Sequence, residues 1–219
     1  MTETLLLVLE IVGTVAFSVS GAMVAIRNRL DIFGVAFIGC ITAVGGGILR
    51  DVLIGRTPPM IFTRTWLLLL SIGVSLAVFL LAYFFRTAYA KWTAPVEHVN
   101  NYFDAVGLAA FSVMGTEVAF SAGVSSSVVL SVVLGFLTGV GGGVMRDILV
   151  NDAPFIFKKH VYALVSILGS GLYFGLRFLI PGETVPTLIA VLFVVLVRIL
   201  AAKYRWNLPR IHGEDESAK

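Results

Sequence analysis

The chain has 219 residues, of which 58% are hydrophobic and only 13% are charged, and its mean hydropathy is +0.96. Soluble domains carry about 25% charged residues, so this composition excludes an ordinary soluble protein and indicates an integral membrane protein. The net charge of +3 comes from basic residues between apolar segments, which favours a role in membrane orientation over nucleic-acid binding. A single cysteine, Cys40, excludes an intrachain disulfide, and without a Cys/His cluster structural zinc is disfavoured.

Seven apolar segments are each long enough to cross the hydrocarbon layer, which takes about 20 helical residues. In chain order they cover residues 5–26, 32–49, 66–85, 102–124, 127–145, 161–180 and 184–202. We expect the first segment to be a retained helix rather than a signal peptide, because no basic stretch precedes it. Tryptophan and tyrosine near segment ends, such as Trp66 and Tyr162, are typical of an aromatic belt. Arg198 is expected to extend to the headgroups.

Basic residues predict the orientation. With seven crossings, twelve Lys and Arg residues fall on one side of the membrane and four on the other. Because short cytoplasmic loops carry an excess of Lys and Arg, we expect the N-terminus outside and the C-terminus in the cytoplasm. Residues 203–219 are expected to form a polar cytoplasmic tail.

Two stretches of the chain repeat. The sequence EIVGTVAFSVSG at 10–21 aligns with DAVGLAAFSVMG at 104–115, and GGGILRDVL at 45–53 aligns with GGGVMRDIL at 141–149. A proline follows each glycine motif, so the similarity is a duplication rather than chance apolar likeness. Each copy has three crossings, an odd number, so the two copies are inverted. We therefore predict an all-α integral membrane fold with repeats at 5–86 and 101–180 and a seventh helix at 184–202, all in one domain at 1–202.

The glycine triplets are the most informative feature, and they consist of Gly45, Gly46, Gly47, Gly141, Gly142 and Gly143. Each glycine costs about 1 kcal/mol of helix preference relative to alanine, so we expect the second and fifth helices to kink or break there. Such backbone is tolerated in hydrocarbon where it lines protein or a water-filled cavity, and matched breaks in inverted repeats indicate a midplane pathway. The alternative is close helix packing through small residues.

The pairs Arg50-Asp51 and Arg146-Asp147 follow the glycines. Adjacent helical residues point about 100° apart, so we expect pairing across the repeats rather than only within each pair. Ionisable residues in the membrane usually pair or line a cavity. The two interpretations are an ion-path or gating role and an interfacial ion pair that only holds the helix ends.

Three acidic residues lie inside apolar segments. Glu10 and Asp104 are repeat equivalents, and each either attracts cations to a conduction path or is simply protonated or hydrogen-bonded. Glu117 has no acidic equivalent, because Met23 occupies that position in the first repeat, and this asymmetry favours a functional role.

Two serines also occupy equivalent positions. Ser18 and Ser112 belong to a repeated Phe-Ser-x-x-Gly sequence. Small polar residues in membrane helices commonly pack at helix interfaces or bend the helix, and the alternative is that the hydroxyls face a pore.

Signals for catalysis are missing from the sequence. No Gly-Lys-Ser/Thr follows the glycines, as a P-loop requires, and the histidines lack metal-ligand spacing. We expect neither an enzyme nor a cofactor.

Two copies of Gly-Gly-Gly-x-x-Arg-Asp in a seven-segment chain resemble the prokaryotic relatives of the TRIC (trimeric intracellular cation) channels, whose bacterial members often carry a glycine-transporter label. The resemblance covers about residues 5–202. It implies a homotrimer with one hourglass pore per protomer, lined by the kinked second and fifth helices and passing K+ and, less selectively, Na+. It also implies kinks in the first and fourth helices, and it indicates Asp147 for gate-stabilising hydrogen bonds.

The chain departs from the eukaryotic members in one motif. They carry Lys-Glu-Val in the fourth helix, where this chain has Thr116-Glu117-Val118. The missing lysine argues against the voltage or lipid regulation of those members. A prokaryotic plasma membrane is expected rather than an internal membrane.

The leading hypothesis is a passive channel for monovalent cations, surrounded by membrane lipids. Backbone carbonyls at the glycines would partly replace ion hydration, and acidic residues would favour cations. A secondary transporter of glycine or another small solute would use the same helix breaks as a binding site. A non-transporting scaffold that trimerises through small-residue faces is the third possibility. A transporter needs a coupling-ion site, and none is evident in the sequence.

Overall fold

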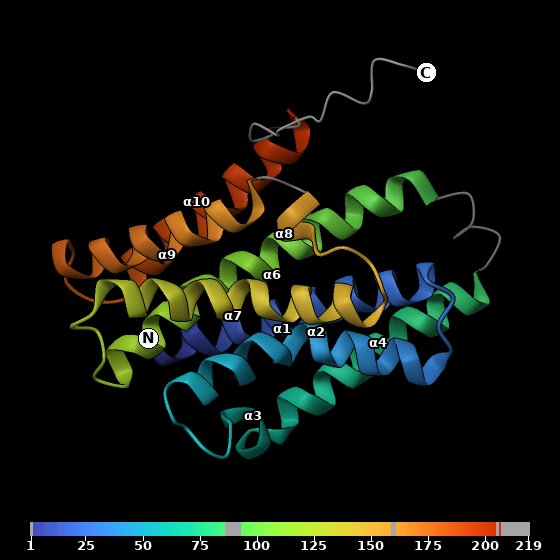
Figure 1. Ribbon diagram of the computed structural model, residues 1–219, viewed down its shortest axis with the longest axis horizontal. Coiled ribbons are helices and arrows are strands. Elements are labelled where there is room, and N and C mark those ends of the chain that lie inside the picture. Colours follow the sequence, from blue (N-terminus) through green and yellow to red (C-terminus); the bar gives the residue numbers. More distant parts are fainter. Residues whose placement is uncertain (1, 86–92, 159–160, 205, 207–219) are drawn as a thin grey trace, which may run out of the picture.

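The computed structural model describes residues 2–85, 93–158, 161–204 and 206, and within them all regular structure is helical. Figure 1 shows the helices side by side in one elongated bundle. The helices are α1 (Thr2–Arg27), α2 (Ile32–Leu53), α3 (Met60–Thr63), α4 (Thr65–Phe84), α6 (Thr93–Ser121), α7 (Val128–Leu149), α8 (Phe155–Lys158), α9 (Tyr162–Leu179) and α10 (Thr184–Lys203). Residue 86 of the first predicted repeat, and residues 205 and 207–219 of the predicted tail, lie outside the described residues.

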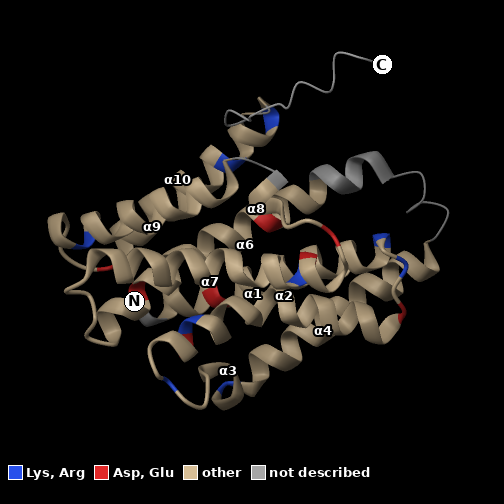
Figure 2. Ribbon diagram, in the orientation of Figure 1, with Lys and Arg blue, Asp and Glu red and all other residues tan. Residues whose placement is uncertain are grey.

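Seven of the described helices are long and apolar enough to cross a membrane, namely all but α3 and α8. The predicted all-α membrane fold with seven spanning helices is therefore confirmed. Two predicted ends differ in ways that matter: α6 begins at Thr93, nine residues before the predicted start at 102. The helices α2 and α7 continue to Leu53 and Leu149, so the Arg-Asp pairs lie inside the last turns of these helices. Figure 2 shows helices that are mostly tan, with charged residues at few positions, as a surface in contact with lipid requires.

The two repeats have the same order of elements. A pair of long helices, α1 and α2, is followed by the short α3 and the long α4, and α6, α7, α8 and α9 repeat this order. Since each repeat contributes three of the spanning helices, the second runs through the bundle in the opposite direction. The helix α10 lies outside the repeat and packs against α6 and α9. The short helices α3 and α8 were not predicted.

The first helices of the two repeats cross at two glycines. The ring of Phe17 in α1 lies over Gly107 of α6, where an added Cβ would overlap it. Reciprocally, a Cβ on Gly13 would lie 3.0 Å from Cε1 of Phe111. The two phenylalanine rings meet with centroids 5.3 Å apart. The repeated Gly and Phe thus form a matched contact between the repeats, and both helices continue through it without interruption.

Candidate functional site

The glycine triplets lie where α2 packs against α7. Both helices are continuous through their glycines, so neither is broken there, and the predicted kink of the second and fifth helices stays a prediction. A Cβ added to Gly46 would overlap the carbonyl oxygen of Thr138, and one added to Gly142 would overlap the carbonyl oxygen of Thr42. The two backbones are therefore in contact, which is the alternative explanation of close packing through small residues.

Gly45 and Gly141 extend the same contact. A Cβ on Gly141 would lie 3.2 Å from Cα of Gly46, and one on Gly45 would lie 3.5 Å from Cα of Gly142. These four glycines bring the two repeats together at backbone distance, a separation that side chains on both helices would prevent.

The last glycine of each triplet faces an arginine instead. Among the described residues, and apart from the backbone of its own helix, the only atom within 4 Å of a Cβ on Gly47 would be Nη2 of Arg50, at 3.7 Å. A Cβ on Gly143 would lie 3.5 Å from the hydroxyl of Tyr162 and 3.7 Å from Nη2 of Arg146. These two glycines therefore border the guanidinium groups and leave room beside them.

The first Arg-Asp pair connects the last turn of α2 to the short helix that follows. Arg50 donates from Nε to Oδ1 of Asp51 at 2.9 Å. The second carboxylate oxygen, Oδ2, accepts from the backbone N–H of Met60, the first residue of α3, at 2.8 Å. A carboxylate at a helix N-terminus is stabilising, so Asp51 holds the arginine and the start of α3 at once.

The second pair repeats this geometry. Arg146 donates from Nε to Oδ1 of Asp147 at 2.8 Å, and the N–H of Phe155, the first residue of α8, donates to Oδ2 at 2.9 Å. The two Arg-Asp pairs do not bond each other, so their predicted pairing across the repeats is wrong, but neither pair bonds only within itself, as expected: Arg146 also donates to Ser20 of the first repeat and to Asp104. The long arginine side chain folds back onto the adjacent carboxylate, even though the two Cα–Cβ bonds point apart.

The α2–α7 contact has two ends, which we call the Arg50 end and the Arg146 end. At the Arg50 end lies a cavity of about 60 Å³, lined by residues that include Glu10, Thr14, Gly47, Arg50 and Arg64. Arg64 donates from Nη1 to Oε2 of Glu10 at 2.9 Å, and its side chain is half exposed. A cavity of this size and polarity has room for a few water molecules.

The Arg146 end is occupied by a polar group of side chains, which we call the Arg146 cluster: Arg146, Ser20, Asp104, Tyr162 and Arg198. Arg146 is fully buried and donates from Nη1 to Oγ of Ser20 at 2.8 Å and to Oδ1 of Asp104 at 3.2 Å. The guanidinium of Arg198 lies 4.5 Å from the ring centroid of Tyr162, and its Nη2 is 4.0 Å from Oδ2 of Asp104. The equivalent acids of the two repeats therefore lie at opposite ends of the α2–α7 contact: Asp104 beside Arg146, and Glu10 beside Arg64.

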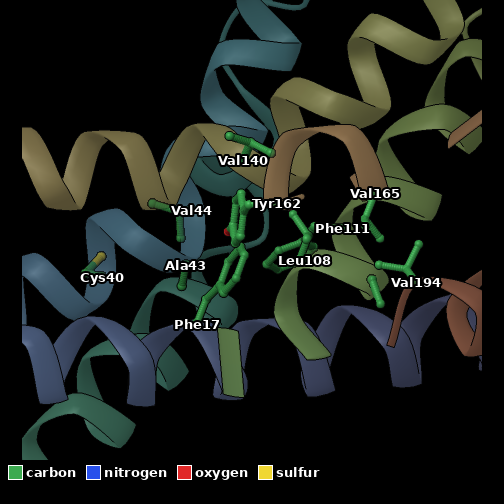
Figure 3. Close-up of a cluster of buried hydrophobic side chains, with 11 residues drawn as sticks. Phe17, Cys40, Ala43, Val44, Leu108, Phe111, Val140, Tyr162, Val165 and Val194 are labelled. Atoms are coloured by element: carbon green, nitrogen blue, oxygen red, sulfur yellow. The ribbon is translucent and has the colours of Figure 1, made fainter. Parts of the chain in front are cut away.

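Tyr162 is the main difference between the repeats. Its position corresponds to Leu67, because the serines four residues further along, Ser71 and Ser166, are both buried at matching places. The tyrosine is 1% exposed, so its predicted place in an interfacial aromatic belt is wrong. Figure 3 shows its ring inside the buried apolar cluster, beside Val140 of α7.

Two further residues distinguish the Arg146 end. Ser20 supplies a hydroxyl where the second repeat has Met114, which lines the cavity at the other end. Arg198 comes from α10, outside the repeat, and at 5% exposure it is buried rather than extended to the headgroups as predicted. A residue-by-residue comparison of the repeats would have found Ser20 and Tyr162 from the sequence, whereas nothing in the sequence placed Arg198.

Glu117 lies in a separate network. Its Oε2 accepts hydrogen bonds from the hydroxyl of Tyr173 and from Nε of Arg177, the latter at 3.2 Å. Arg177 also donates to Glu183, just before α10, at 3.3 Å. The carboxylate therefore connects α6 to α9 and to the start of α10, and it does not line the cavity at the Arg50 end.

The two repeated serines are fully buried. Ser18 donates from Oγ to the carbonyl oxygen of Thr14 at 2.7 Å, and Oγ of Ser112 lies 2.7 Å from Oγ of Ser166. Neither serine lines the cavity at the Arg50 end. These contacts favour helix packing over a pore-facing role.

Each repeat matches the same protein family. The family model described as "Glycine transporter" matches residues 7–83 and 101–177. Among curated relatives, the UPF0126 inner membrane protein YadS of Escherichia coli (strain K12) is 34% identical over 203 residues, which cover 92% of this chain and 93% of the relative. The UPF0126 membrane protein YvgT of Bacillus subtilis (strain 168) is 36% identical over 204 residues, covering 92% and 94%.

Solved structures also resemble the chain over nearly its whole length. One, described as a prokaryotic TRIC channel in 0.5 M KCl, is 35% identical with a TM-score of 0.83, covering 94% of this chain and 100% of that one. Another, from work on conductance through TRIC cation channels, is 37% identical with a TM-score of 0.81, covering 94% and 97%. The TRIC trimeric intracellular cation channel orthologue from Rhodobacter sphaeroides is 28% identical with a TM-score of 0.82, covering 93% and 100%.

Proposed function

Because this chain belongs to the prokaryotic TRIC family, we propose that it is a passive channel for monovalent cations, principally K+, and neither an enzyme nor a secondary transporter. One observation supports this proposal most: two inverted Arg-Asp sites flank a backbone contact of α2 and α7, with a cavity at one end and a buried polar cluster at the other. The proposed path runs along this contact within each protomer. A homotrimer agrees with the name of the related trimeric channel.

The proposed path begins at the Arg50 end. The cavity there brings a partly buried carboxylate, Glu10, within reach of water, and a carboxylate in a low-dielectric mouth concentrates cations. The path continues past Gly47, where a Cβ would have room beside the side chain of Arg50, to the contact of Gly46 with Thr138. Carbonyl oxygens of Thr42 and Thr138 at this contact are the candidate ion ligands, in place of the glycine carbonyls expected from a broken helix.

The path ends at the Arg146 cluster, which in this conformation closes it. Arg146 is held by three partners, and Tyr162 fills the space that a leucine occupies at the other end. A buried guanidinium repels a passing cation, so conduction requires this cluster to rearrange. The structure therefore corresponds to a closed channel under this proposal.

The chain is a multi-pass protein of the bacterial inner membrane, since the curated relatives are named membrane or inner membrane proteins and seven helices are apolar enough to span. We further propose that the Arg146 end faces the cytoplasm. The distribution of twelve basic residues against four favours this orientation, with the N-terminus outside and the C-terminus inside.

The closure is tested by exchanging the residues that distinguish the two ends. We expect Tyr162→Leu to raise the open probability of the reconstituted protein several-fold, because Arg198 loses its aromatic partner, a contact of about 0.5–2 kcal/mol. The reciprocal variant Leu67→Tyr should lower the K+ current, because the added ring fills the cavity at the Arg50 end. Single-channel recording measures both. Equal open probability in the wild type and Tyr162→Leu would contradict the proposal that the Arg146 cluster closes the path.

The mouth at the Arg50 end is tested by Glu10→Gln. Neutralising the carboxylate leaves Arg64 unpaired beside the cavity, so we expect the unitary K+ conductance to fall about two- to fivefold at low salt and less at high salt. Glu183→Gln is the matched control, because that acid pairs with Arg177 away from the cavity. If the two variants have the same unitary K+ conductance at low salt, the entrance of the ion path is not at Glu10.

A further inference from the structure

Four buried polar atoms of the Arg146 cluster have no hydrogen-bond partner among the described residues. They are Nη2 of Arg146, Nε of Arg198, Oδ2 of Asp104 and the hydroxyl oxygen of Tyr162, and their side chains are at most 5% exposed. In the described part of the chain, Asn100 and Thr187 hold the two other side-chain atoms of this kind. Buried polar atoms are nearly always paired with protein or ordered water, because leaving them unpaired is costly. Four in one cluster therefore indicate a bound group that pairs with them together.

The four side chains lie close together. Nη2 of Arg198 is 4.0 Å from Oδ2 of Asp104, whose other oxygen accepts from Arg146 at 3.2 Å. The guanidinium of Arg198 lies 4.5 Å from the ring centroid of Tyr162. A Cβ on Gly143 would come within 4 Å of the Tyr162 hydroxyl and of Nη2 of Arg146, but of neither Asp104 nor Arg198. The backbone of α7 thus borders the cluster without a side chain and leaves room on this side of it.

The other repeat has a cavity at the equivalent place. Asp104, Arg146 and Tyr162 have counterparts in the first repeat, and all of these line the cavity of about 60 Å³ at the Arg50 end: Glu10, Arg50 and Leu67. The inverted repeats therefore leave space for water at this position of the fold. At the Arg146 end, the ring of Tyr162 takes part of that space and brings a hydroxyl to it.

The chemistry of the four atoms selects the occupant. The two guanidinium nitrogens donate, the Asp104 oxygen accepts, and the Tyr162 hydroxyl can do either. A water molecule accepts two hydrogen bonds and donates two, so it matches this set. A chloride ion would meet the Asp104 carboxylate, and a potassium ion would meet two guanidinium groups. The two arginines are balanced by Asp104 and Asp147, so no net charge favours either ion.

We propose that one buried water molecule occupies the Arg146 cluster. It accepts hydrogen bonds from Arg146 and Arg198 and donates to Asp104 and Tyr162, in the manner of buried waters that make about three such bonds. The site does not depend on whether the protein conducts. Its consequence rests on the proposed function: the water joins Arg198 of α10 to Arg146 of α7, so that Arg198 is a positioning residue in the closed conformation.

The occupant is tested by diffraction from crystals of the full chain, at a resolution that shows ordered water. We expect one peak within about 2.7–3.2 Å of at least three of the four atoms. Further crystals contain bromide in place of chloride, or rubidium in place of potassium, and should show no anomalous signal at this peak. A bromide or rubidium signal would assign the site to an ion, and a cluster without any peak would overturn it.

The water is also tested in solution. X-ray irradiation turns water into hydroxyl radicals, which label the side chains beside it and are detected by mass spectrometry. We expect Tyr162 to be labelled several-fold more than Tyr173. This second tyrosine is the matched control, because it is equally buried in α9 and its hydroxyl donates to Glu117 instead. Equal labelling of the two tyrosines would overturn the site.

Tyr162→Phe tests the hydrogen bond to the water by the sign of its effect on stability. The variant keeps the ring beside Arg198 and removes only the hydroxyl. Losing a bond to water should lower the midpoint of thermal unfolding by about 2–4 °C, as Tyr173→Phe should by losing the bond to Glu117. Removing an unpaired buried hydroxyl would raise the midpoint instead. A raised or unchanged midpoint in Tyr162→Phe would therefore contradict the bound water.

The consequence for closure is tested separately in planar bilayers. Tyr162→Phe should raise the open probability, though less than Tyr162→Leu, because the ring beside Arg198 remains. Equal open probability in the wild type and Tyr162→Phe would overturn the positioning role of Arg198 through the water. Diffraction and labelling need no current, so a failure of the channel proposal and a failure of the water site give different results.

Discussion

Gly142→Ala is expected to destabilise the protein strongly, by about 3 kcal/mol, although it adds a single methyl group. The added Cβ would overlap the carbonyl oxygen of Thr42 in the opposite repeat, and this neighbour is backbone rather than the end of a flexible side chain. Removing this overlap therefore requires α2 and α7 to move apart along their contact. For a chain of this size the midpoint of thermal unfolding should fall by roughly 6–12 °C.

The matched control is the next residue of the same triplet. Among the described residues outside its own helix backbone, a Cβ on Gly143 would meet nothing closer than 3.5 Å, so Gly143→Ala should be neutral or stabilising by up to about 1 kcal/mol through helix preference. Thermal unfolding of the purified proteins, followed by circular dichroism, measures the difference. The same contrast is expected between Gly46→Ala and Gly47→Ala. Equal stability of Gly142→Ala and Gly143→Ala would show that the two backbones are not in contact.

Among substitutions of charged residues, Arg146→Gln should destabilise the protein most, lowering the free energy of unfolding by about 3–5 kcal/mol. Arg146 is 0% exposed and bonded to both Asp104 and Asp147, so its loss leaves two buried carboxylates without their main cation. The yield of folded, monodisperse protein and its unfolding midpoint should both fall sharply.

Arg50→Gln provides the comparison at the other end. Arg50 bonds a single carboxylate, Asp51, beside a cavity with room for water, and Arg56 lies 3.9 Å from the same carboxylate. Arg50→Gln should therefore lower the free energy of unfolding by less than half as much as Arg146→Gln. Should the two variants unfold at the same temperature, the two ends of the α2–α7 contact would be equivalent, contrary to the structure.

The sequence predicted the architecture well because a duplication repeats specific residues at matching positions, which a merely apolar composition does not do. Repeated Gly, Arg, Asp and Pro at matching places defined the two copies, and apolar length defined the seven spanning helices. An odd number of crossings then required inversion. These inferences depend on local residue types and on counting, which tertiary contacts do not alter.

The sequence predicted the site less well, because burial decides it. Low helix preference at Gly45–Gly47 suggested a break, but packing against the other repeat keeps α2 helical. The same glycines instead allow the backbones of α2 and α7 to come into contact. Arg198 was expected at the headgroups because it lies near the end of its segment. Only the packing of α10 against α6 and α9 brings it to Tyr162 and Asp104.

The central claim is that the protein conducts cations passively, and the reversal potential of the purified protein in a planar bilayer tests it most directly. Under a tenfold KCl gradient, we expect unitary currents that reverse close to the K+ equilibrium potential, about 59 mV in magnitude for ideal selectivity. The contradicting result is an absence of unitary currents together with saturable glycine uptake into vesicles that contain the same protein.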